Sequence, residues 1–197
     1  MFTGIIEATG KVESSSSEGN NRTYWLSSSI SNELKVDQSV SHDGVCLTIE
    51  EVRGNMHRVT AINETLKKTN LEIWNEGSSI NIERCMELNG RLDGHIVQGH
   101  VETTAICMER KNEKGSWEFN FNFDRQFAAL VIEKGSISIN GISLTVFNVT
   151  TTSFSVAIIP YTFEHTNIKT VEAGSVVNIE FDIIGKYVNR IQQLKAD

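Results

Sequence analysis

Apolar and polar residues alternate along much of the chain. The clearest case is residues 117–123, Trp-Glu-Phe-Asn-Phe-Asn-Phe, whose period of two is typical of a β-strand with one buried face. Other short runs rich in Val, Ile, Thr and Phe are separated by Gly, Asn and Ser, residues that favour turns. The pattern therefore predicts an all-β fold.

Some segments depart from this period. Residues 63–70 and 160–167 are predicted to form short helices, and Pro160 suits the first turn of the second helix. Residues 14–21, SSSSEGNN, are polar and rich in turn-forming types, and they interrupt the strand pattern. We expect them to form a hairpin loop.

The end of the chain carries a helical pattern. Within residues 186–195, Tyr187, Ile191 and Leu194 follow one another at spacings of four and three, while most other positions are polar. This spacing predicts a C-terminal helix with one apolar face.

The chain contains an internal repeat. Residues 42–52, HDGVCLTIEEV, match residues 139–149, INGISLTVFNV, so the two copies are offset by 97 residues. At the front of each copy, residues 2–10 match residues 97–105 at an offset of 95. The fold is therefore built twice.

The repeat extends to the last strands of each copy, where Asn81-Ile82-Glu83 matches Asn178-Ile179-Glu180. Copies of this length, made of short strands, commonly close into barrels or Greek-key sheets, which hide their strand edges. We therefore expect two tandem β-barrels, with the boundary at Gly94.

Composition narrows the class of protein. With 18 Lys and Arg against 25 Asp and Glu, the net charge of −7 excludes a basic nucleic-acid-binding scaffold. The three cysteines, Cys46, Cys85 and Cys107, are odd in number and lack Cys-x-x-Cys spacing, which argues against a disulfide framework and a structural zinc site. Neither a signal peptide nor a membrane-spanning segment is expected, so we predict a cytoplasmic protein in a reducing compartment.

Nucleotide-binding, metalloprotease, hydrolase and calcium-loop motifs do not occur in the sequence, so we predict neither cofactor nor metal. The repeat is a better guide, because positions that differ between matched copies are candidates for divided roles. Cys46 corresponds to Ser143, and each precedes Leu-Thr. Thr48 and Thr145 lie two residues further on and therefore on the same strand face. Cys46 is either a small inert core residue or a thiol in a pocket.

Two further differences involve titratable groups. His100 takes the place of Ile5, and an imidazole side chain would suit proton transfer. His95 is as readily a turn residue as a functional one. Asp182 corresponds to Cys85 and is either a solvated carboxylate at a strand end or a group that reaches a neighbouring subunit.

Six motifs, in order along the chain, resemble those of one family: MFTGII, SHDGVCLTI, GHIVQGHVE, SINGISLTV, IPYTFEHTNI and NIEFDIIGKYVNRI. The family is that of riboflavin synthases of the alpha-chain type, which have two lumazine-binding repeats, and the resemblance runs from Met1 to about Ile191. It implies two six-stranded Greek-key barrels, at 1–94 and 95–185, a C-terminal helix at 186–197, and a homotrimer held together by that helix.

The resemblance also implies a reaction. Two molecules of 6,7-dimethyl-8-ribityllumazine would be converted into riboflavin and 5-amino-6-ribitylamino-pyrimidinedione, as the last step of riboflavin biosynthesis, without cofactor or metal. A duplicated barrel offers two similar pockets for two identical substrates. Lumazine synthase is a further candidate partner. The alternative is a noncatalytic carrier or antenna protein of the same ancestry that binds a lumazine or flavin.

The resemblance assigns residues to the two pockets. For the first barrel these are Gly4, Ile5, Ile6, Cys46, Leu47, Thr48, Ile62, Thr65, His100 and Val101, and Gly99 is also expected to contact substrate. For the second barrel they are Lys134, Ser143, Leu144, Thr145, Ile159 and Thr162. The catalytic residues would be His100 as base, Cys46 or Ser41 adding to the donor, and Ser143 with Asp182 nearby.

Overall fold

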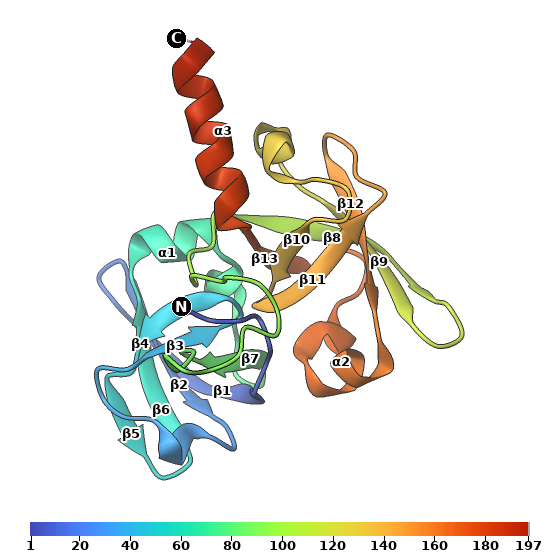
Figure 1. The fold of residues 1–197 in the computed structure, drawn as a ribbon. Helices are drawn as coiled ribbons and strands as arrows, with labels where there is room; N and C mark the ends of the chain where they lie inside the picture. The colour runs from blue at the N-terminus through green and yellow to red at the C-terminus, as the bar shows by residue number, and fades with distance from the viewer. Residues whose placement is uncertain (197) are drawn as a thin grey trace.

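The two sequence copies fold into two β-barrels that lie side by side, and a helix projects from the second barrel (Figure 1). The structure is a computed structural model and describes residues 1–196. The predicted all-β class and the tandem barrels are confirmed.

The first copy forms a seven-stranded sheet in the order β4-β3-β7-β1-β2-β6-β5. Its strands are β1 (Ala8–Glu18), β2 (Asn21–Ser27), β3 (Ser39–His42), β4 (Val45–Thr48), β5 (Glu51–Arg53), β6 (Met56–Ala61) and β7 (Ser79–Arg84). The two ends of this order, β4 and β5, are separated only by residues 49 and 50, so they are two parts of one bent strand. The Glu50 amide donates to the Arg58 carbonyl at 2.9 Å, which joins the bend to β6 and returns the sheet onto itself.

The second copy forms a closed six-stranded barrel in the order β10-β11-β12-β9-β8-β13. Its strands are β8 (Thr103–Asn112), β9 (Trp117–Asn122), β10 (Ser136–Ile139), β11 (Ile142–Phe147), β12 (Ser153–Ile158) and β13 (Val176–Phe181). Here β11 is continuous where the first copy has β4 and β5. Each copy therefore has six strand positions.

Short helices connect the strands at matched places. They are α1 (Asn63–Lys68), α2 (Pro160–His165) and the 3-10 segments η1 (Ser31–Glu33), η2 (Asn70–Ile73), η3 (Arg125–Leu130) and η4 (Asn167–Thr170). Both predicted helices are present, and each ends two residues earlier than expected. Within residues 1–196, no helix is both long and apolar enough to span a membrane.

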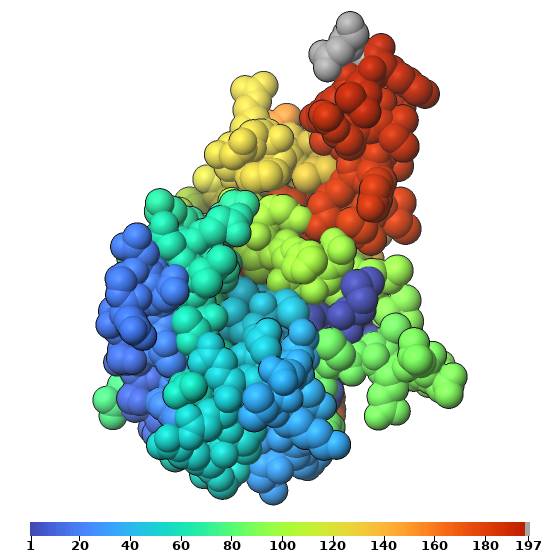
Figure 2. Space-filling model, turned by 90° about the vertical axis from the view of Figure 1, so that its left-hand side faces the viewer, coloured from blue at the N-terminus to red at the C-terminus, as the bar shows by residue number. Residues whose placement is uncertain are grey.

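The terminal helix α3 (Ile183–Ala196) begins three residues before the predicted start. Asp182 causes this difference, because its Oδ1 accepts the Ile184 amide at 2.9 Å and so caps the helix. Figure 2 shows α3 at one end of the molecule, beside the segment that contains η3.

The polar run at residues 14–21 does not form the predicted loop. Residues 14–17 continue β1 and pair with residues 22–25 of β2, and the turn is reduced to two residues. Gly19, with φ at 59°, supplies the left-handed conformation that such tight hairpins need. Backbone pairing with β2 stabilises the serine run, whose side chains are mostly exposed.

The barrels approach each other closely at matched glycines. Gly44 and Gly141 both have φ near +80°, and a Cβ on either one would lie 2.8 Å from the backbone nitrogen of the other. The contact between the two copies, besides the turn conformation, therefore requires glycine at both positions.

A buried network of amides and one carboxyl group surrounds this contact. Asp43 Oδ1 accepts from the Asn81 amide at 2.7 Å and from Asn167 Nδ2 at 2.8 Å, and Asn140 Oδ1 accepts from the Asn178 amide at 2.8 Å. Burial raises the pKa of Asp43 to about 8, while its hydrogen bonds with Asn81 and Asn167 act in the opposite direction. The two barrels are therefore joined by polar groups that are bonded to one another.

The segments that lead into the two barrels cross. We call residues 1–7 the first lead segment and residues 93–102 the second lead segment. The Phe2 amide donates to the Val97 carbonyl at 2.7 Å, and the Val97 amide returns a bond of 3.1 Å. Each lead segment therefore passes onto the barrel of the other copy.

Candidate active site

A cavity of about 610 Å³ lies where the second lead segment meets the first barrel, and we call it the first-barrel pocket. Its lining from the first copy is Val45, Cys46, Glu64, Thr65, Lys68 and Thr69, and its lining from the second copy is Gly99, His100, Val101, Glu102 and Phe127. The structure thus brings together five predicted residues from distant parts of the chain: Cys46, Thr65, Gly99, His100 and Val101.

Backbone hydrogen bonds hold the two sides of the first-barrel pocket together. The Cys46 amide donates to the Gly99 carbonyl at 2.9 Å, and Val101 packs against the core of the first barrel. Glycine is required at position 99, because it has φ of +82° and a Cβ there would lie 2.5 Å from the Cys46 Cβ. The His100 side chain is exposed at the pocket wall.

Cys46 is half-buried on the same strand face as Thr48, as the alternation predicted. Burial raises the pKa of its thiol, although a hydrogen bond with Ser39 acts in the opposite direction. Because the thiolate is the reactive form, a raised pKa favours a neutral thiol that lines the pocket over an activated nucleophile.

The second barrel repeats this arrangement with the first lead segment. The Ser143 amide donates to the Gly4 carbonyl at 2.8 Å, and Ile6 packs against the core of the second barrel. The expectation that Gly4, Ile5 and Ile6 belong to the pocket of the first barrel is therefore wrong. Because the lead segments cross, these residues lie against the second barrel.

His95, which the sequence left open between a turn residue and a functional one, takes part in this second region. Its Nδ1 lies 2.7 Å from the Ser143 hydroxyl oxygen, and its side chain is largely buried. Burial lowers the pKa of His95, and the nearby carboxylate of Asp182 acts in the opposite direction. Asp182 therefore acts in two ways, as the cap of α3 and as a negative charge near His95.

Several predicted residues lie at the edges of these two regions. Ile62 and Ile159 precede α1 and α2 and expose 54% and 60% of their surface, which leaves matched apolar side chains free beside each barrel. Thr162 takes in α2 the place of Thr65 in α1. Lys134 is exposed, with its ammonium 5.5 Å from the ring of Phe147.

Other predicted residues are placed elsewhere. Ser41 is only 1% exposed and lies at the contact between the barrels, within 3.5 Å of the position a Gly141 Cβ would take. Leu47 belongs to the core of the first barrel, and Leu144 packs against the core of the second. Thr145, like Thr48, is exposed on the outer strand face.

Several residues of the first-barrel pocket were not predicted from the sequence. Lys68 and Glu64 form an ion pair of 2.6 Å at its edge, and Phe127 enters from η3 of the other copy. Glu102 follows the predicted residues directly, but no feature of the sequence set it apart. Glu180, which binds the second lead segment, could have been found, because Asn-Ile-Glu is identical in both copies.

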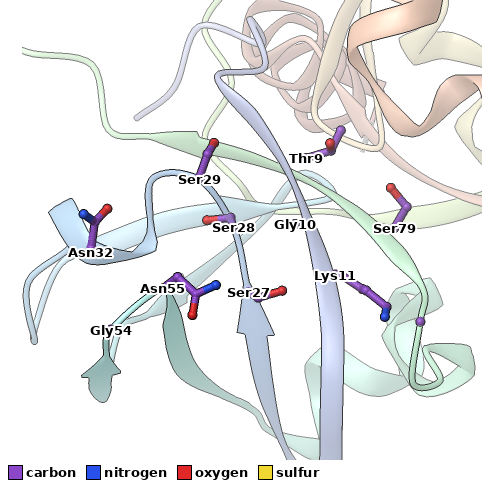
Figure 3. Close-up of a pocket in the computed structure, with 11 residues that line it drawn as sticks. Thr9, Gly10, Lys11, Ser27, Ser28, Ser29, Asn32, Gly54, Asn55 and Ser79 are labelled. Atoms are coloured by element: carbon purple, nitrogen blue, oxygen red, sulfur yellow. The ribbon is translucent and has the colours of Figure 1, made fainter.

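A wider hollow of about 750 Å³ lies on the flank of the first barrel (Figure 3). It is lined by small and polar residues, among them Lys11, Ser28 and Asn55. No predicted site residue contributes to it. In the second copy, the position of Lys11 is held by Ile106.

Possible metal ligands do not gather in the described part of the chain: among residues 1–196, no three His, Cys, Asp or Glu side chains form a group that could hold a metal ion.

Comparisons with known proteins agree with the duplicated architecture. The family model of the lumazine binding domain matches the chain twice, at residues 3–85 and 98–182. Riboflavin synthases from Actinobacillus pleuropneumoniae and Bacillus subtilis are each 37% identical over 191 residues, which cover 96% of this chain and 89% of the relative. The riboflavin synthase of Saccharomyces cerevisiae is 34% identical over 203 residues, covering 96% and 85%.

The two matches define a protein built from a pair of lumazine-binding domains. With its relatives aligned over nearly its whole length, the chain belongs to the riboflavin synthase family. Crystal structures of LumP with riboflavin and with 6,7-dimethyl-8-(1'-D-ribityl) lumazine are similar in fold, with TM-scores of 0.86 and 0.84 at 19% and 18% identity. Each comparison covers 92% of this chain and 99% of LumP.

Proposed function

We propose that this chain is a riboflavin synthase, a transferase that acts on two molecules of 6,7-dimethyl-8-ribityllumazine. One molecule gives up a four-carbon unit and leaves as 5-amino-6-ribitylamino-pyrimidinedione, and the other receives this unit and becomes riboflavin. Membership of the family supports the proposal, since relatives from bacteria and yeast carry this name.

One observation carries the proposal. The chain builds the same half-site twice, each time from one barrel and the lead segment of the other copy, with matched bonds from Cys46 to Gly99 and from Ser143 to Gly4. A reaction between two identical substrates needs two similar binding sites. It also needs a chemical difference between them, which His100 against Ile5 and Cys46 against Ser143 provide.

The volume of the first-barrel pocket suits one bicyclic substrate, because small-molecule sites commonly enclose roughly 300 to 1,000 Å³. In our proposal, Thr48, Thr65 and backbone amides bind the pyrimidinedione edge, and Ile62 covers the ring. The second barrel offers Thr145, Thr162 and Ile159 in the same roles. Holding the two rings in register lowers the barrier by roughly 7 to 11 kcal/mol.

His100 is the proposed base. The methyl group on carbon 7 of the substrate loses a proton to give an anion delocalised over the ring, so a modest base is sufficient. The exposed His100 imidazole lines the first-barrel pocket, where it can reach a bound substrate. Cys46 then contributes as a neutral hydrogen-bonding side chain, in agreement with its raised pKa.

Incubation of the purified protein with 6,7-dimethyl-8-ribityllumazine alone tests the function. We expect riboflavin to form, seen by its absorbance, without added metal, nucleotide or reductant. A requirement for a metal, or loss of activity with a chelator, would contradict the proposal. Substrate binding without product would instead support the carrier or antenna protein.

We also propose a homotrimer that α3 holds together, with each active site completed by a second subunit. Five apolar side chains of α3 are more than half exposed: Ile184, Tyr187, Val188, Ile191 and Leu194. Such a stripe has little to pack against within one chain. A trimer in which these helices meet would cover it.

Charge on the apolar face of α3 tests the trimer. We expect the double variant Ile191→Glu with Leu194→Glu to sediment as a monomer and to lose riboflavin formation, since the active site would then be incomplete. Gln193→Glu is the matched control, because it adds a charge to another face of the same helix. A monomeric double variant with full activity would show that the site lies within one chain.

The proposal also includes the cellular compartment of the protein and a possible protein partner. Cys46, Cys85 and Cys107 are all free, which suits the reducing cytoplasm. Lumazine synthase stays a candidate partner, and co-sedimentation of the two purified proteins is the test.

A further inference from the structure

The part of the second lead segment that lines the first-barrel pocket has no regular secondary structure, so its amides need other partners. One carboxylate supplies most of them. Glu180 accepts the amide of Gln98 at 2.6 Å and the amides of Gly99 and His100 at 2.8 Å each. Glu180 is 2% exposed. A buried charge bonded to three successive amides fixes the backbone that carries His100.

A second carboxylate connects the same segment to the terminal helix. Glu102 accepts the Phe181 amide through Oε2 at 3.1 Å, and its Oε1 pairs with the ammonium of Lys186 in the first turn of α3. Both side chains are mostly buried, at 24% and 19% exposed. This ion pair is therefore shielded from solvent more than the other ion pairs among residues 1–196.

Among the residues that the structure describes, no ion pair connects the first lead segment to α3. Glu83 binds it much as Glu180 binds the second, through the amides of Thr3 at 2.7 Å and Gly4 at 3.0 Å. The counterpart of Glu102 is Glu7, which pairs with Arg84 of β7 at 2.7 Å. The link to α3 therefore belongs to the half-site that contains Cys46 and His100.

Helix α3 reaches the first-barrel pocket by a second route. It packs against η3, and Val188 and Leu130 line a common cavity between the two helices. Phe127 of the same η3 lines the first-barrel pocket. Two separate contacts thus lead from α3 to that pocket. The helix projects away from the barrels (Figure 1), and most of its apolar side chains are more than half exposed.

We propose that Glu180, Glu102 and Lys186 are positioning residues that set the place of His100 and Val101, and that the packing of α3 against a second copy of this chain acts on the first-barrel pocket through them. The proposal rests on the proposed function for its kinetic consequences. Its structural part, the coupling of α3 to residues 98–102, stands on the contacts alone.

Lys186→Met tests the coupling with little change in side-chain length. We expect a several-fold loss of kcat/KM for the lumazine. Amide exchange in residues 98–102 should become faster by about tenfold, because a local opening that costs less free energy exchanges more often. Lys195→Met is the matched control on the same helix and should leave both quantities at the wild-type value. Both variants should sediment like the wild type.

The pH profile separates positioning from a general loss of structure. The charged or titratable groups that act on Glu180 are Lys186, which lowers its pKa, and Glu102, which raises it; Glu180 in turn raises the pKa of the Cys46 thiol. We expect Lys186→Met to move the acid limb of kcat/KM to higher pH and Glu102→Gln to move it to lower pH. A merely structural role would not shift the two variants in opposite directions.

Glu180→Gln, which would place an amide group among three N–H donors, is a harsher variant. Should it not fold, the Lys186 and Glu102 variants carry the test alone. Wild-type kcat/KM, exchange and pH profile in Lys186→Met would overturn the proposal. If the wild type forms no riboflavin, the proposed function fails, while the exchange comparison between Lys186→Met and Lys195→Met still decides the coupling.

Discussion

The first barrel contains a buried chain of hydrogen bonds where the second barrel is filled by apolar groups. His42 Nδ1 lies 3.0 Å from the Val40 carbonyl and must donate to it, so His42 Nε2 accepts from His57 Nε2 at 2.8 Å. His57 Nδ1 then accepts from the Ser31 hydroxyl at 2.8 Å, and Ser28 lies 2.8 Å further along. Every member of this chain has a defined role as donor or acceptor.

In the second barrel the matched positions are Ile139, Phe154 and Ala128. Phe154 packs against Phe121 and Phe123 with ring centroids 5.7 and 5.6 Å apart. The interiors have therefore diverged, while the outward pairs Cys46 with Gly99 and Ser143 with Gly4 have stayed alike. A barrel interior can change its residues as long as it stays filled and its polar groups stay hydrogen-bonded. Two similar half-sites, in contrast, require the same backbone arrangement on the outside of both barrels.

The largest effect is expected at the position where the two half-sites differ in titratable chemistry. His100→Ala should lower kcat by about 10² to 10⁴, since that is what a general base commonly contributes. Substrate affinity, measured by fluorescence titration, should change much less. Ile5→Ala in the other half-site is the comparison and should act mainly on affinity. Near-normal turnover in His100→Ala would remove His100 from the mechanism.

Asp43 and its counterpart Asn140 offer the second comparison. Because burial raises the pKa of Asp43 to about 8 in the folded state, its contribution to stability is fully present below the unfolded pKa of 3.8 and is lost as the pH rises through 8. Asp43→Asn should remove this loss. We expect its stability relative to the wild type to increase from pH 4 to pH 8 by on the order of 5 kcal/mol.

Urea unfolding at pH 4, 6 and 8 measures this difference. Asn140→Asp, which adds a second buried carboxyl group, should show the opposite trend with pH. A constant difference between Asp43→Asn and the wild type would contradict the raised pKa.

The imidazoles of the first barrel should respond in the opposite direction. Burial lowers the pKa of His57 to about 4 and that of His42 well below its usual range, with the His42–His57 interaction acting in the same direction on His42. Their contribution is therefore present above the unfolded pKa of 6.5 and is lost as the pH falls toward 4. For His57 alone the loss is on the order of 3 kcal/mol.

Replacing the two buried histidines of the first barrel by the matched residues of the second barrel tests this pH dependence of stability. The double variant His42→Ile with His57→Phe should gain stability relative to the wild type as the pH falls from 7 to 4, in the same unfolding assay. Asp43 is unchanged in both proteins, so its own pH dependence cancels. The single variant His57→Phe leaves His42 Nε2 without its donor and should be less stable than the double variant.

The smallest effect is expected for Cys46→Ser, which makes the two half-sites alike at this position. A neutral thiol that lines a pocket can be replaced by a hydroxyl with modest cost, so kcat should fall less than about tenfold. Slow alkylation of the wild-type Cys46 thiol at pH 7, followed by mass spectrometry, provides an independent check. A loss as large as that of His100→Ala would restore Cys46 as a nucleophile.

The fold was predictable because its signals are local or repeated. Strict alternation at 117–123 indicated a strand, and the offset of 97 residues indicated two copies. The serine run at 14–17 was misjudged because its strand is stabilised by pairing with β2, which the side chains do not show. Pairing between distant segments has no signal in a single sequence.

The prediction of the site is limited for the same reason, because contacts between distant segments cannot be predicted from one sequence. The resemblance placed Cys46, Thr65, His100 and Val101 in one pocket, and these four residues and Gly99 line one cavity. The lead segments cross at the bridge between Phe2 and Val97. This is a tertiary contact, and no local sequence pattern predicts it. The position of Gly4 and Ile6 against the second barrel rests on further tertiary contacts, the bond from the Ser143 amide to the Gly4 carbonyl and the packing of Ile6 on the core of that barrel.

The crossing also orders events during synthesis, because a chain emerges from the ribosome with its N-terminus first. Gly4 is among the first residues made and Ser143 is made late, so the bond between the Ser143 amide and the Gly4 carbonyl forms only after most of the chain has been synthesised. A nascent chain that holds only the first barrel has neither half-site, since the wall at Gly99 and His100 is still missing. Because each half-site needs the barrel of one copy and the lead segment of the other, deleting either copy removes both half-sites.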